Sequence, residues 1–431
     1  MKTNSVSCPA LLVTAPASGH GKTSVTAALA RFHSRNGLRV RCFKTGPDFI
    51  DPTLLAAASG QAVYNLDSWI MGSEHCRQLL YDAAAESDLI LVEGVMGLFD
   101  GEPSSADLAE LFGLPVLPVI DAAAMAQTFA AVLHGLATFR PSLTVAGAVA
   151  NRVASARHAD LLRTGLPAGL QLASLPRNPQ ASLPGRHLGL QLADEIADIA
   201  GRLDQLADAI GETWLAKLPP AIAFAAPARS PKPEPLLQGK TIAVARDRAF
   251  CFLYQQNLDC LRDMGARLKF FSPLADDALP DADAVYLPGG YPELYADTLA
   301  GNNRPRADIQ AHIAQAKPLL AECGGMMYLT EALLDVEGRR HEMLGVMPGV
   351  AVMQGKLSAI GSQQAELDGQ IVRGHTFHYS TLQTPLSAIA QAQTVNGHGG
   401  EAVYRLGLAT ASYLHFYFPS NPEAIAGLFL A

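Results

Sequence analysis

Residues 10–24 read ALLVTAPASGHGKTS, an apolar run that leads through a loop of small residues to a lysine and two hydroxyl side chains. The apolar run predicts a buried strand, and the alanine-rich segment that starts at Lys22 predicts a helix. A loop of this composition between a strand and a helix is typical of sites where backbone N–H groups and a helix N-terminus bind phosphate. The stretch therefore predicts a phosphate-binding α/β domain.

The loop departs at one position from the Walker A consensus G-x-x-x-x-G-K-[S/T], because Pro16 replaces the first glycine. Gly19, Gly21, Lys22 and Thr23 retain the part of the motif that contacts phosphate. We expect Lys22 to contact the β- and γ-phosphates of ATP and Thr23 to bind Mg²⁺. The alternative is an ordinary strand-to-helix turn with a chance Gly-x-Gly, but the Lys-Thr pair favours the nucleotide site.

Short apolar runs alternate with longer Ala- and Leu-rich segments up to about residue 215. This alternation predicts βαβ units and a mostly parallel sheet covered by helices, with ligands at the carboxyl ends of the strands. The expected strands are 10–14, 39–43, 89–93, 115–121 and 144–150.

Two acidic segments follow expected strands. FKTGPDFIDP at 43–52 carries Asp48 and Asp51, which either cap the next helix or belong to the phosphate site, because Asp is a preferred N-cap residue. LVEGVMGLFDG at 91–101 places Glu93 at the tip of a strand, where P-loop enzymes place a metal-binding carboxylate, although a solvated loop acid is the alternative. With the phosphate loop, these segments resemble the dethiobiotin synthetase-like branch of P-loop proteins, which make acyl or carbamate phosphates.

Residues 216–238 contain six prolines and no helical or alternating pattern, which predicts a linker between a domain at 1–215 and a second domain at 239–431. The second domain again alternates strand-like and helix-like segments, so we expect another α/β unit. Its expected strands are 241–245, 267–271, 284–287 and 318–322, and its expected helices lie near 252–265 and 307–316.

A candidate nucleophile lies in AECGGMMYL at 321–329, where Cys323 stands between an apolar strand and a turn of small residues that opens a helix. A sharp strand-to-helix elbow exposes a thiol, the helix N-terminus lowers its pKa, and the N–H of Gly324 helps to bind an oxyanion. Cysteine is otherwise a common buried residue. The position between Glu322 and two glycines favours a catalytic thiol.

A thiol nucleophile needs a base, and His415 follows an apolar run near the C-terminus. LPGGYPE at 287–293 offers backbone N–H groups, including that of Gly290, for an oxyanion hole. These features fit class I glutamine amidotransferases. Those enzymes usually carry Glu two residues after the histidine, whereas Tyr417 stands there in this chain, so the third member of the triad is absent or supplied from elsewhere.

Composition limits the class of protein. The chain has 431 residues, 49% of them hydrophobic, and 32 Lys and Arg against 40 Asp and Glu give a net charge of −8. We therefore expect no nucleic-acid partner and no membrane partner. The six cysteines show no metal-ligand spacing and fit a reducing cytoplasm, and no apolar run is long enough for a transmembrane helix.

Across nearly the whole chain, a series of strings resembles the cobyrinate a,c-diamide synthase family of cobalamin biosynthesis, including its hydrogenobyrinate-using members. The resemblance implies a P-loop domain followed by a flavodoxin-like, class I amidotransferase domain. It also implies amidation of the a and c acetates of a corrin polycarboxylate, with ATP and L-glutamine as co-substrates. The strings are ASGHGKTS, FKTGPDFIDP, NLDSWIMG (65–72), LVEGVMGLFDG, LPRN (175–178), LPGRHLGL (183–190), LPGGYPELYA, AECGGMMYL, RGHTFHYS (373–380) and ASYLHFYFPSNP.

The resemblance also implies roles for residues at matching positions. Cys323 would be the glutaminase nucleophile and His415 the residue that raises its nucleophilicity. The other implied roles are ATP binding for Gly19, Gly21, Lys22, Thr23 and Lys44, metal binding for Thr23, Asp51 and Glu93, substrate binding for Asp48 and Asp100, and the oxyanion hole for Gly290 and Gly324. Arg373, His375 and His378 either face substrate or make structural hydrogen bonds, and a homodimer is left open.

Three alternatives stay open from the sequence. A related tetrapyrrole amidase would act on nickel-sirohydrochlorin or, as cobyric acid synthase, on the other side chains of the corrin. A partitioning or regulatory ATPase would bind protein or DNA, and the charge of −8 and the Cys323 elbow argue against it. An inert corrinoid-binding relative would have no need of Lys22, Thr23 and Cys323.

Overall fold

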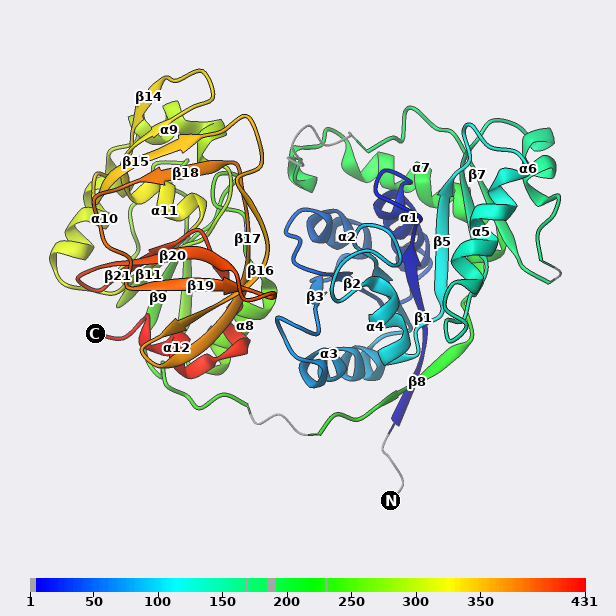
Figure 1. The fold of residues 1–431 in the computed structure, drawn as a ribbon, viewed down its shortest axis with the longest axis horizontal. Coiled ribbons are helices and arrows are strands. Elements are labelled where there is room, and N and C mark those ends of the chain that lie inside the picture. The colour runs from blue at the N-terminus through cyan, green and yellow to red at the C-terminus, as the bar shows by residue number, and fades with distance from the viewer. Residues whose placement is uncertain (1–4, 168, 184–190, 229–231) are drawn as a thin grey trace. The chain divides into compact units, whose positions relative to one another are not determined.

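The computed structural model describes residues 5–167, 169–183, 191–228 and 232–431 (Figure 1). The chain divides into two compact units, Met1–Ser230 and Pro231–Ala431. Each unit has its own sheet and its own buried apolar clusters. The predicted fold class is confirmed: a parallel-sheet P-loop domain is followed by a second α/β domain.

The sheet of the first unit is parallel in the order β3-β2-β4-β1-β5-β6-β7, and β8 pairs antiparallel with β1. This order brings the carboxyl ends of β2, β4 and β1 side by side. The strands are β1 (Ser5–Thr14), β2 (Val40–Thr45), β3 (Tyr64–Leu66), β4 (Leu89–Glu93), β5 (Val116–Asp121), β6 (Ala148–Val153), β7 (Leu172–Pro176) and β8 (Ala221–Ala225). The helices are α1 (Lys22–Arg35), α2 (Asp51–Ser59), α3 (Ser73–Glu86), α4 (Ser105–Phe112), α5 (Thr128–Thr138), α6 (Ala156–Arg163), α7 (Ile199–Gly211), η1 (Ala193–Glu195) and η2 (Trp214–Ala216).

Burial explains why β1 stands in the centre of this sheet. Its residues from Ala10 to Thr14 are all buried, as expected of a parallel strand covered by helices on both faces. Leu11 and Val13 pack in one cluster with Leu29 of α1 and Leu203 of α7. The loop after β1 therefore starts from a rigid position at the edge where ligands bind in such sheets.

In the structure, the first half of the predicted linker at 216–238 contains a strand. β8 (Ala221–Ala225) lies in this range and pairs antiparallel with residues 5–9 of β1. β1 is itself longer than the expected strand 10–14, and its extra residues supply the partner for β8. β8 was not predicted because its residues, AIAFA, do not alternate with polar ones, and only Phe224 is buried in the structure.

The second unit contains a mixed sheet in the order β10-β9-β11-β12-β21-β20-β19-β16-β17-β22 and a smaller sheet in the order β14-β13-β15-β18. The first five strands of the large sheet are parallel, and the others are antiparallel. Adjacent β11, β12 and β21 bring three chain segments to one edge. These segments are the glycine loop after β11, the turn that carries Cys323 after β12, and the run to His415 after β21.

The elements of the second unit have the following bounds. The strands are β9 (Thr241–Ala245), β10 (Arg267–Phe271), β11 (Ala284–Leu287), β12 (Leu319–Glu322), β13 (Thr330–Leu334), β14 (Arg340–Glu342), β15 (Met347–Met353), β16 (Ala359–Leu367), β17 (Gln370–His378), β18 (Ser380–Gln383), β19 (Ala390–Thr394), β20 (Gly399–Leu406), β21 (Ala409–Ser412) and β22 (His415–Phe416). The helices are α8 (Gln255–Asp263), η3 (Pro292–Tyr295), α9 (Ala296–Gly301), α10 (Arg304–Ala314), α11 (Gly324–Leu329), η4 (Phe418–Ser420) and α12 (Pro422–Gly427).

The antiparallel half of this unit was not predicted. The expected strands at 241–245, 267–271 and 284–287 coincide with β9, β10 and β11, whereas no strand was expected between residues 330 and 406. Strand β16 shows why, because its only buried residues are Gln363, Ala365 and Leu367. Half-exposed strands with polar residues on the buried face leave little apolar alternation in the sequence.

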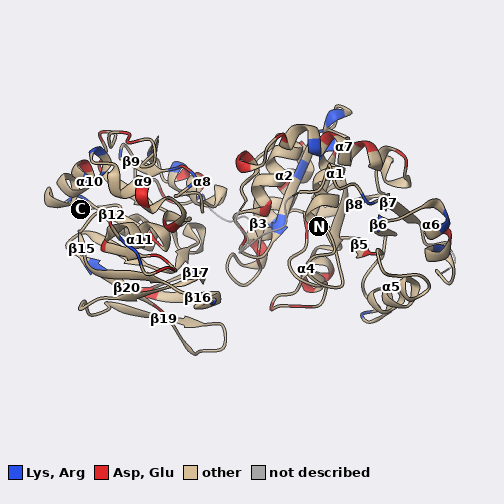
Figure 2. Cartoon of the chain, turned by 90° about the horizontal axis from the view of Figure 1, so that it is seen from above, with Lys and Arg blue, Asp and Glu red and all other residues tan. Residues whose placement is uncertain are grey.

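The cysteines and the helices bear on two expectations, free thiols and no transmembrane helix. The part of the chain that the structure describes contains no disulfide bond, as expected. No helix in the same part is both long enough and apolar enough to cross a membrane. Acidic and basic residues occur in both units (Figure 2).

Candidate active sites

The loop after β1 bends at two glycines with positive φ, Gly19 at +87° and Gly21 at +92°. Gly21 is the N-cap of α1, and a Cβ atom there would overlap the side-chain amide of Asn151. That amide, from β6, donates to the carbonyl of His20 at 3.0 Å. Glycine is therefore required at position 21 both for the backbone conformation and for space.

Lys22 folds back over this loop. Its Nζ donates to the carbonyls of Ala17 at 3.2 Å and Met96 at 2.5 Å. Burial, together with the nearby charge of Lys44, lowers the pKa of Lys22 to about 8, although Glu93 and Asp100 act in the opposite direction. A bound polyphosphate would supply the negative charge that favours the ammonium form.

Thr23 and Glu93 form a pair of hard oxygen donors. Thr23 Oγ1 donates to Glu93 Oε1 at 2.6 Å, and Glu93 is 1% exposed. Burial raises the pKa of Glu93, while Lys44 and Thr23 oppose the rise. Within the described ranges, Glu93 Oε2 is buried with no hydrogen-bond partner. A hydroxyl and a carboxylate with an unused buried oxygen fit Mg²⁺, which is held by few protein oxygens beside phosphates and waters.

Lys44 lies behind this pair, between two acids. Its Nζ donates to the carbonyl of Gly94 at 3.0 Å, and it lies 3.5 Å from Asp51 Oδ2 and 3.7 Å from Glu93 Oε1. All three charged side chains are buried. The structure thus brings Lys44, a candidate ATP-binding residue, next to Asp51 and Glu93, two candidate metal ligands. The described residues contain no group of three or more His, Cys, Asp or Glu side chains arranged to hold a metal alone.

The two candidate substrate acids make local contacts. Asp48 Oδ1 accepts from the N–H groups of Ile50 at 2.8 Å and Asp51 at 3.0 Å, at the start of α2. Asp100 Oδ2 accepts from the N–H of Gly97 at 3.1 Å and closes the loop after β4. The capping alternative for Asp48 therefore matches its geometry. It does not exclude contact with a substrate through the other oxygen.

Sequence reasoning missed a polar layer on the far side of the phosphate loop. His20 Nδ1 accepts from the N–H of Asp121 at 2.8 Å, and burial lowers the pKa of His20. The carboxylate of Asp121 contacts the guanidinium of Arg152. His20 lies in the phosphate loop, Asp121 ends β5 and Arg152 lies near the end of β6, so their place at the ligand-binding edge was the available signal.

The predicted nucleophile lies on a strained elbow. Cys323, between β12 and α11, has φ +45° and ψ −108°, a region that non-glycine residues rarely adopt. Its N–H donates to the carbonyl of Ser412 at 2.7 Å. The expectation of a lowered thiol pKa is wrong for this structure, because burial and the charge of Glu293 raise it. Helix α11, only six residues long, does not reverse that effect.

The two oxyanion-hole candidates lie against each other. A Cβ atom on Gly324 would lie 3.0 Å from the backbone N of Gly290. A Cβ atom on Gly290 would overlap the carbonyl of Ala249. Glycines at both positions let the loop after β11 approach the elbow closely.

His415 is buried at the same sheet edge. Its ring stacks on that of His375, with centroids 5.0 Å apart and an interplanar angle of 19°. Its Nδ1 lies 4.0 Å from Oε2 of Glu322. Burial, with help from His375 and His378, lowers the pKa of His415 well below its ordinary value. The imidazole is therefore neutral and able to accept a proton.

His378 has contacts that support the structural alternative. Its Nε2 lies 2.9 Å from Glu401 Oε1, and its Nδ1 lies 2.8 Å from the carbonyl of Ser380. The ring stacks on Tyr413 at 3.8 Å. Hydrogen bonds at both nitrogens fix this ring within the antiparallel half of the sheet.

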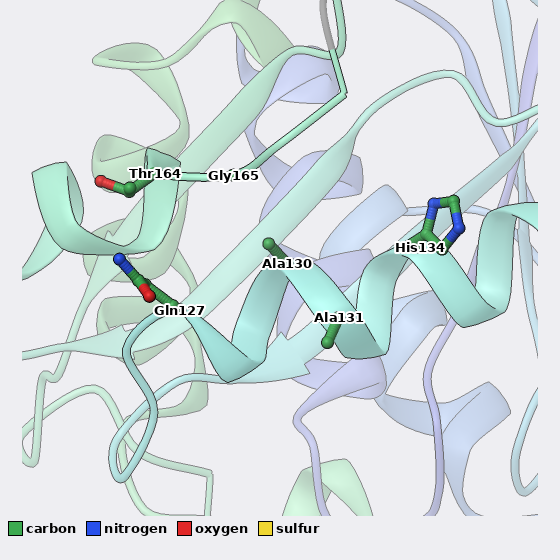
Figure 3. Close-up of a pocket in the computed structure, with 6 residues that line it drawn as sticks. All are labelled: Gln127, Ala130, Ala131, His134, Thr164 and Gly165. Carbon is green, nitrogen blue, oxygen red and sulfur yellow. The ribbon is translucent and has the colours of Figure 1, made fainter.

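One cavity lies outside every predicted site. It has a volume of about 410 Å³ and lies beside α5 and the end of α6 (Figure 3). Its lining residues are Gln127, Ala130, Ala131, His134, Thr164 and Gly165. The string LPGRHLGL at 183–190, which contributed to the family resemblance, lies outside the described residues from 184 onward.

Two protein-family models match the chain, one in each unit. The CobQ/CobB/MinD/ParA nucleotide binding domain matches residues 11–189, and the CobB/CobQ-like glutamine amidotransferase domain matches residues 241–423. The first match contains the phosphate loop, and the second contains Cys323 and His415. A partitioning ATPase alone does not account for the second match.

Three curated relatives align over almost the full chain. The hydrogenobyrinate a,c-diamide synthases of Stutzerimonas stutzeri and Pseudomonas aeruginosa are each 56% identical over 98% of this chain, and the alignments cover 98% and 97% of those proteins. The cobyrinate a,c-diamide synthase of Herminiimonas arsenicoxydans is 52% identical over 97% of this chain and 96% of that protein.

Proposed function

Because the chain belongs to the hydrogenobyrinate and cobyrinate a,c-diamide synthase family, we propose that it amidates the a and c acetate carboxylates of a corrin. ATP and glutamine are the co-substrates, and the enzyme is a ligase that forms C–N bonds in cobalamin biosynthesis. The observation that carries this proposal is full-length similarity to a,c-diamide synthases in a chain that retains both the phosphate loop and the Cys323 elbow. All three relatives bear that name, which favours this reaction over the other tetrapyrrole amidations.

In the first unit, the phosphate loop binds ATP. Backbone N–H groups around Gly19 and Gly21 surround the phosphates, and Lys22 leaves its carbonyl partners to contact the β- and γ-phosphates. Thr23 and Glu93 would hold Mg²⁺, with Asp51 near the same site. When bound, Mg²⁺ neutralises phosphate charge as the γ-phosphoryl group is transferred.

Lys44 keeps the acids of this site in place. Its ammonium lies within 3.7 Å of both Asp51 and Glu93, so it limits their mutual repulsion in a buried position. An acetate oxygen of the corrin attacks the γ-phosphorus, ADP leaves, and an acyl phosphate forms without a covalent protein intermediate. Asp48 and Asp100, on the loops after β2 and β4, orient the substrate.

In the second unit, Cys323 releases ammonia from glutamine. His415 takes the thiol proton, the thiolate attacks the side-chain amide carbon, and the N–H groups of Gly290 and Gly324 bind the resulting oxyanion. His415 then returns the proton to the leaving ammonia, and water hydrolyses the glutamyl thioester. The ammonia nitrogen attacks the acyl phosphate carbon, and inorganic phosphate leaves.

Incubation of the purified protein with Mg-ATP and glutamine, with hydrogenobyrinic acid in one arm and cobyrinic acid in the other, tests this function. Mass spectrometry should show a product in which two hydroxyls are replaced by two amino groups, with ADP and glutamate formed once per amide. Comparison of the two arms identifies whether the corrin carries cobalt. If neither arm yields a diamide, the proposed function is wrong.

A further inference from the structure

An aromatic residue occupies the position from which class I amidotransferases usually supply an acid to the histidine. Tyr417, two residues after His415, is fully buried, and its N–H donates to the carbonyl of Arg373 at 2.8 Å. Its ring meets Tyr254 edge-on with centroids 5.6 Å apart. Tyr254 in turn makes a 2.9 Å hydrogen bond with Nδ1 of His375. This position is therefore part of an aromatic cluster.

A carboxylate reaches His415 from a different strand. Glu322 is the last residue of β12 and directly precedes Cys323. Its Oε2 lies 4.0 Å from Nδ1 of His415, and each of these residues is 1% exposed. The pairing of β12 with β21, in which Glu322 opposes Ser412, brings the two side chains to the same sheet edge.

Two donors hold this carboxylate. The hydroxyl of Tyr286 donates to Oε2 at 2.8 Å, and the N–H of Phe416 donates to Oε1 at 3.0 Å. Phe416 directly follows His415, so one carboxylate both fixes the backbone beside the base and lies near its ring.

The ring of His415 is also restrained on its faces. His375 stacks on it, and Phe252 meets it at 5.8 Å with an interplanar angle of 60°. Gly289 packs so closely that a Cβ atom there would lie 3.0 Å from Nδ1 of His415. These contacts limit rotation of the imidazole, so Nδ1 stays on the side of Glu322.

We propose that Glu322 is the positioning residue for His415, in place of the acid that class I enzymes carry two residues after the histidine. The inference rests on the proposed glutaminase role of Cys323 and His415. When ionised, Glu322 orients the imidazole through Nδ1–H, and its carboxylate stabilises the imidazolium that forms when His415 accepts the Cys323 proton. Glu322 itself contacts no substrate, and the 4.0 Å separation shortens when glutamine binds, as catalytic contacts commonly do.

The environment explains why the pair must act together. Burial raises the pKa of Glu322 to about 8, although Tyr286 and Phe416 oppose the rise, and burial lowers the pKa of His415. Each group alone therefore favours its neutral form, whereas a carboxylate beside an imidazolium stabilises both charges. The other titratable groups near the Cys323–His415–Glu322 set are Tyr254, Tyr286, Glu293, His375, His378, Glu401 and Tyr413.

The test is Glu322→Gln in the full-length protein, measured with glutamine and separately with an ammonium salt. We expect kcat for glutamine hydrolysis to fall about 10²- to 10³-fold, with little change in KM for glutamine and with ammonia-dependent amidation kept. The acid limb of the kcat/KM profile for glutamine should move to lower pH, because His415 loses the carboxylate that favours its protonated form. The amide can accept from Phe416 and donate to Tyr286, so the fold is preserved.

The matched control is Asp335→Asn, which neutralises the acid of another buried pair in the same unit. Asp335 Oδ2 lies 3.1 Å from His341 Nε2 on the small sheet. This variant should keep the wild-type kcat and pH profile for glutamine. If Glu322→Gln folds poorly, Tyr286→Phe replaces it, with kcat expected to fall roughly tenfold because the carboxylate loses one of its two donors.

Two results would overturn the inference. One is an unchanged kcat and pH profile in Glu322→Gln or, where Tyr286→Phe replaces it, an unchanged kcat. The other is an equal loss of glutamine-dependent and ammonia-dependent amidation, which would indicate a general structural role. Failure of the proposed function is a separate outcome, because wild-type protein would then lack glutaminase activity before any substitution is made.

Discussion

The phosphate loop and the cysteine elbow are both built at the carboxyl ends of parallel strands, but their buried ionisable groups are paired differently. Around the phosphate loop, buried Lys44 lies within 3.7 Å of Asp51 and Glu93, so opposite charges are held close together. Around the elbow, burial raises the pKa values of Cys323 and Glu322 and lowers that of His415.

The difference follows from the chemistry proposed for each site. Polyphosphate brings several negative charges, so its site contains lysines and a hydroxyl–carboxylate pair before the ligand arrives. Thiol chemistry needs charge only during proton transfer, and a buried neutral set can form a thiolate and an imidazolium when the substrate is present. We infer that the phosphate loop is arranged to bind a negatively charged ligand. The Cys323 elbow is arranged to form a thiolate and an imidazolium during the reaction.

The largest effect should come from Cys323→Ala. Glutamine-dependent amidation should fall by about 10³-fold or more, because the only group proposed to attack the glutamine amide is removed. Ammonia-dependent amidation should persist, which would separate the two sites functionally. Cys260→Ala, which removes another buried thiol of the same unit, should retain both activities. Glutamine-driven turnover in Cys323→Ala would refute the assignment of the nucleophile.

A second variant tests the phosphate loop of the first unit. Lys22→Met should lower amidation about 10²- to 10³-fold with either glutamine or ammonia, because phosphate charge is no longer neutralised. The melting temperature should not fall, since Lys22 is a buried cation whose pKa is about 8. Lys217→Met, at an exposed position of the same unit, serves as the control. Ammonia-driven amidation at the wild-type rate would contradict the role of Lys22.

The pH dependence of stability tests whether Glu322, at the Cys323 elbow, is neutral in the folded protein. The pKa of Glu322 is about 8 in the folded protein against an ordinary 4.5, so the folded state keeps a proton that the unfolded chain releases in this window. The wild type therefore loses stability as pH rises from 4.5 to about 8. Glu322→Gln lacks this loss, and its free energy of unfolding should gain on the order of 2 kcal/mol relative to wild type.

Urea unfolding of both proteins at several pH values within that window measures the difference. The two stability curves should converge at the acid end and separate toward the alkaline end. Parallel curves would mean that Glu322 is ionised throughout, and the description of the elbow as a neutral site would then be wrong.

The smallest effect concerns Asp48. Asp48→Ala should lower the free energy of unfolding by about 1 kcal/mol, because the acceptor at the start of α2 is lost. Asp48→Asn keeps that acceptor and should keep the stability, but KM for the corrin should rise several-fold if the charge orients substrate. Wild-type values for Asp48→Asn in both assays would leave Asp48 with a capping role alone.

Local motifs were predictable because their residues are consecutive. The phosphate loop, the Cys323 elbow and strands β4, β9 and β11 have strong apolar runs bounded by small residues, and their positions agree with the structure. The antiparallel half of the second unit was missed, because its strands bury few apolar side chains. β8 was missed for the same reason, and the expected linker therefore started too early.

By itself the sequence determined two α/β units, a phosphate loop in the first and a cysteine elbow in the second, because each depends on neighbouring residues and on the period of apolar positions. Only the tertiary structure decided which distant side chains meet. Strand pairing placed Lys44 between Asp51 and Glu93, and it brought Glu322 to His415 while Tyr417 joined an aromatic cluster. Such contacts join residues far apart along the chain, 93 positions for Glu322 and His415 and 163 for Tyr254 and Tyr417, and no local pattern encodes them.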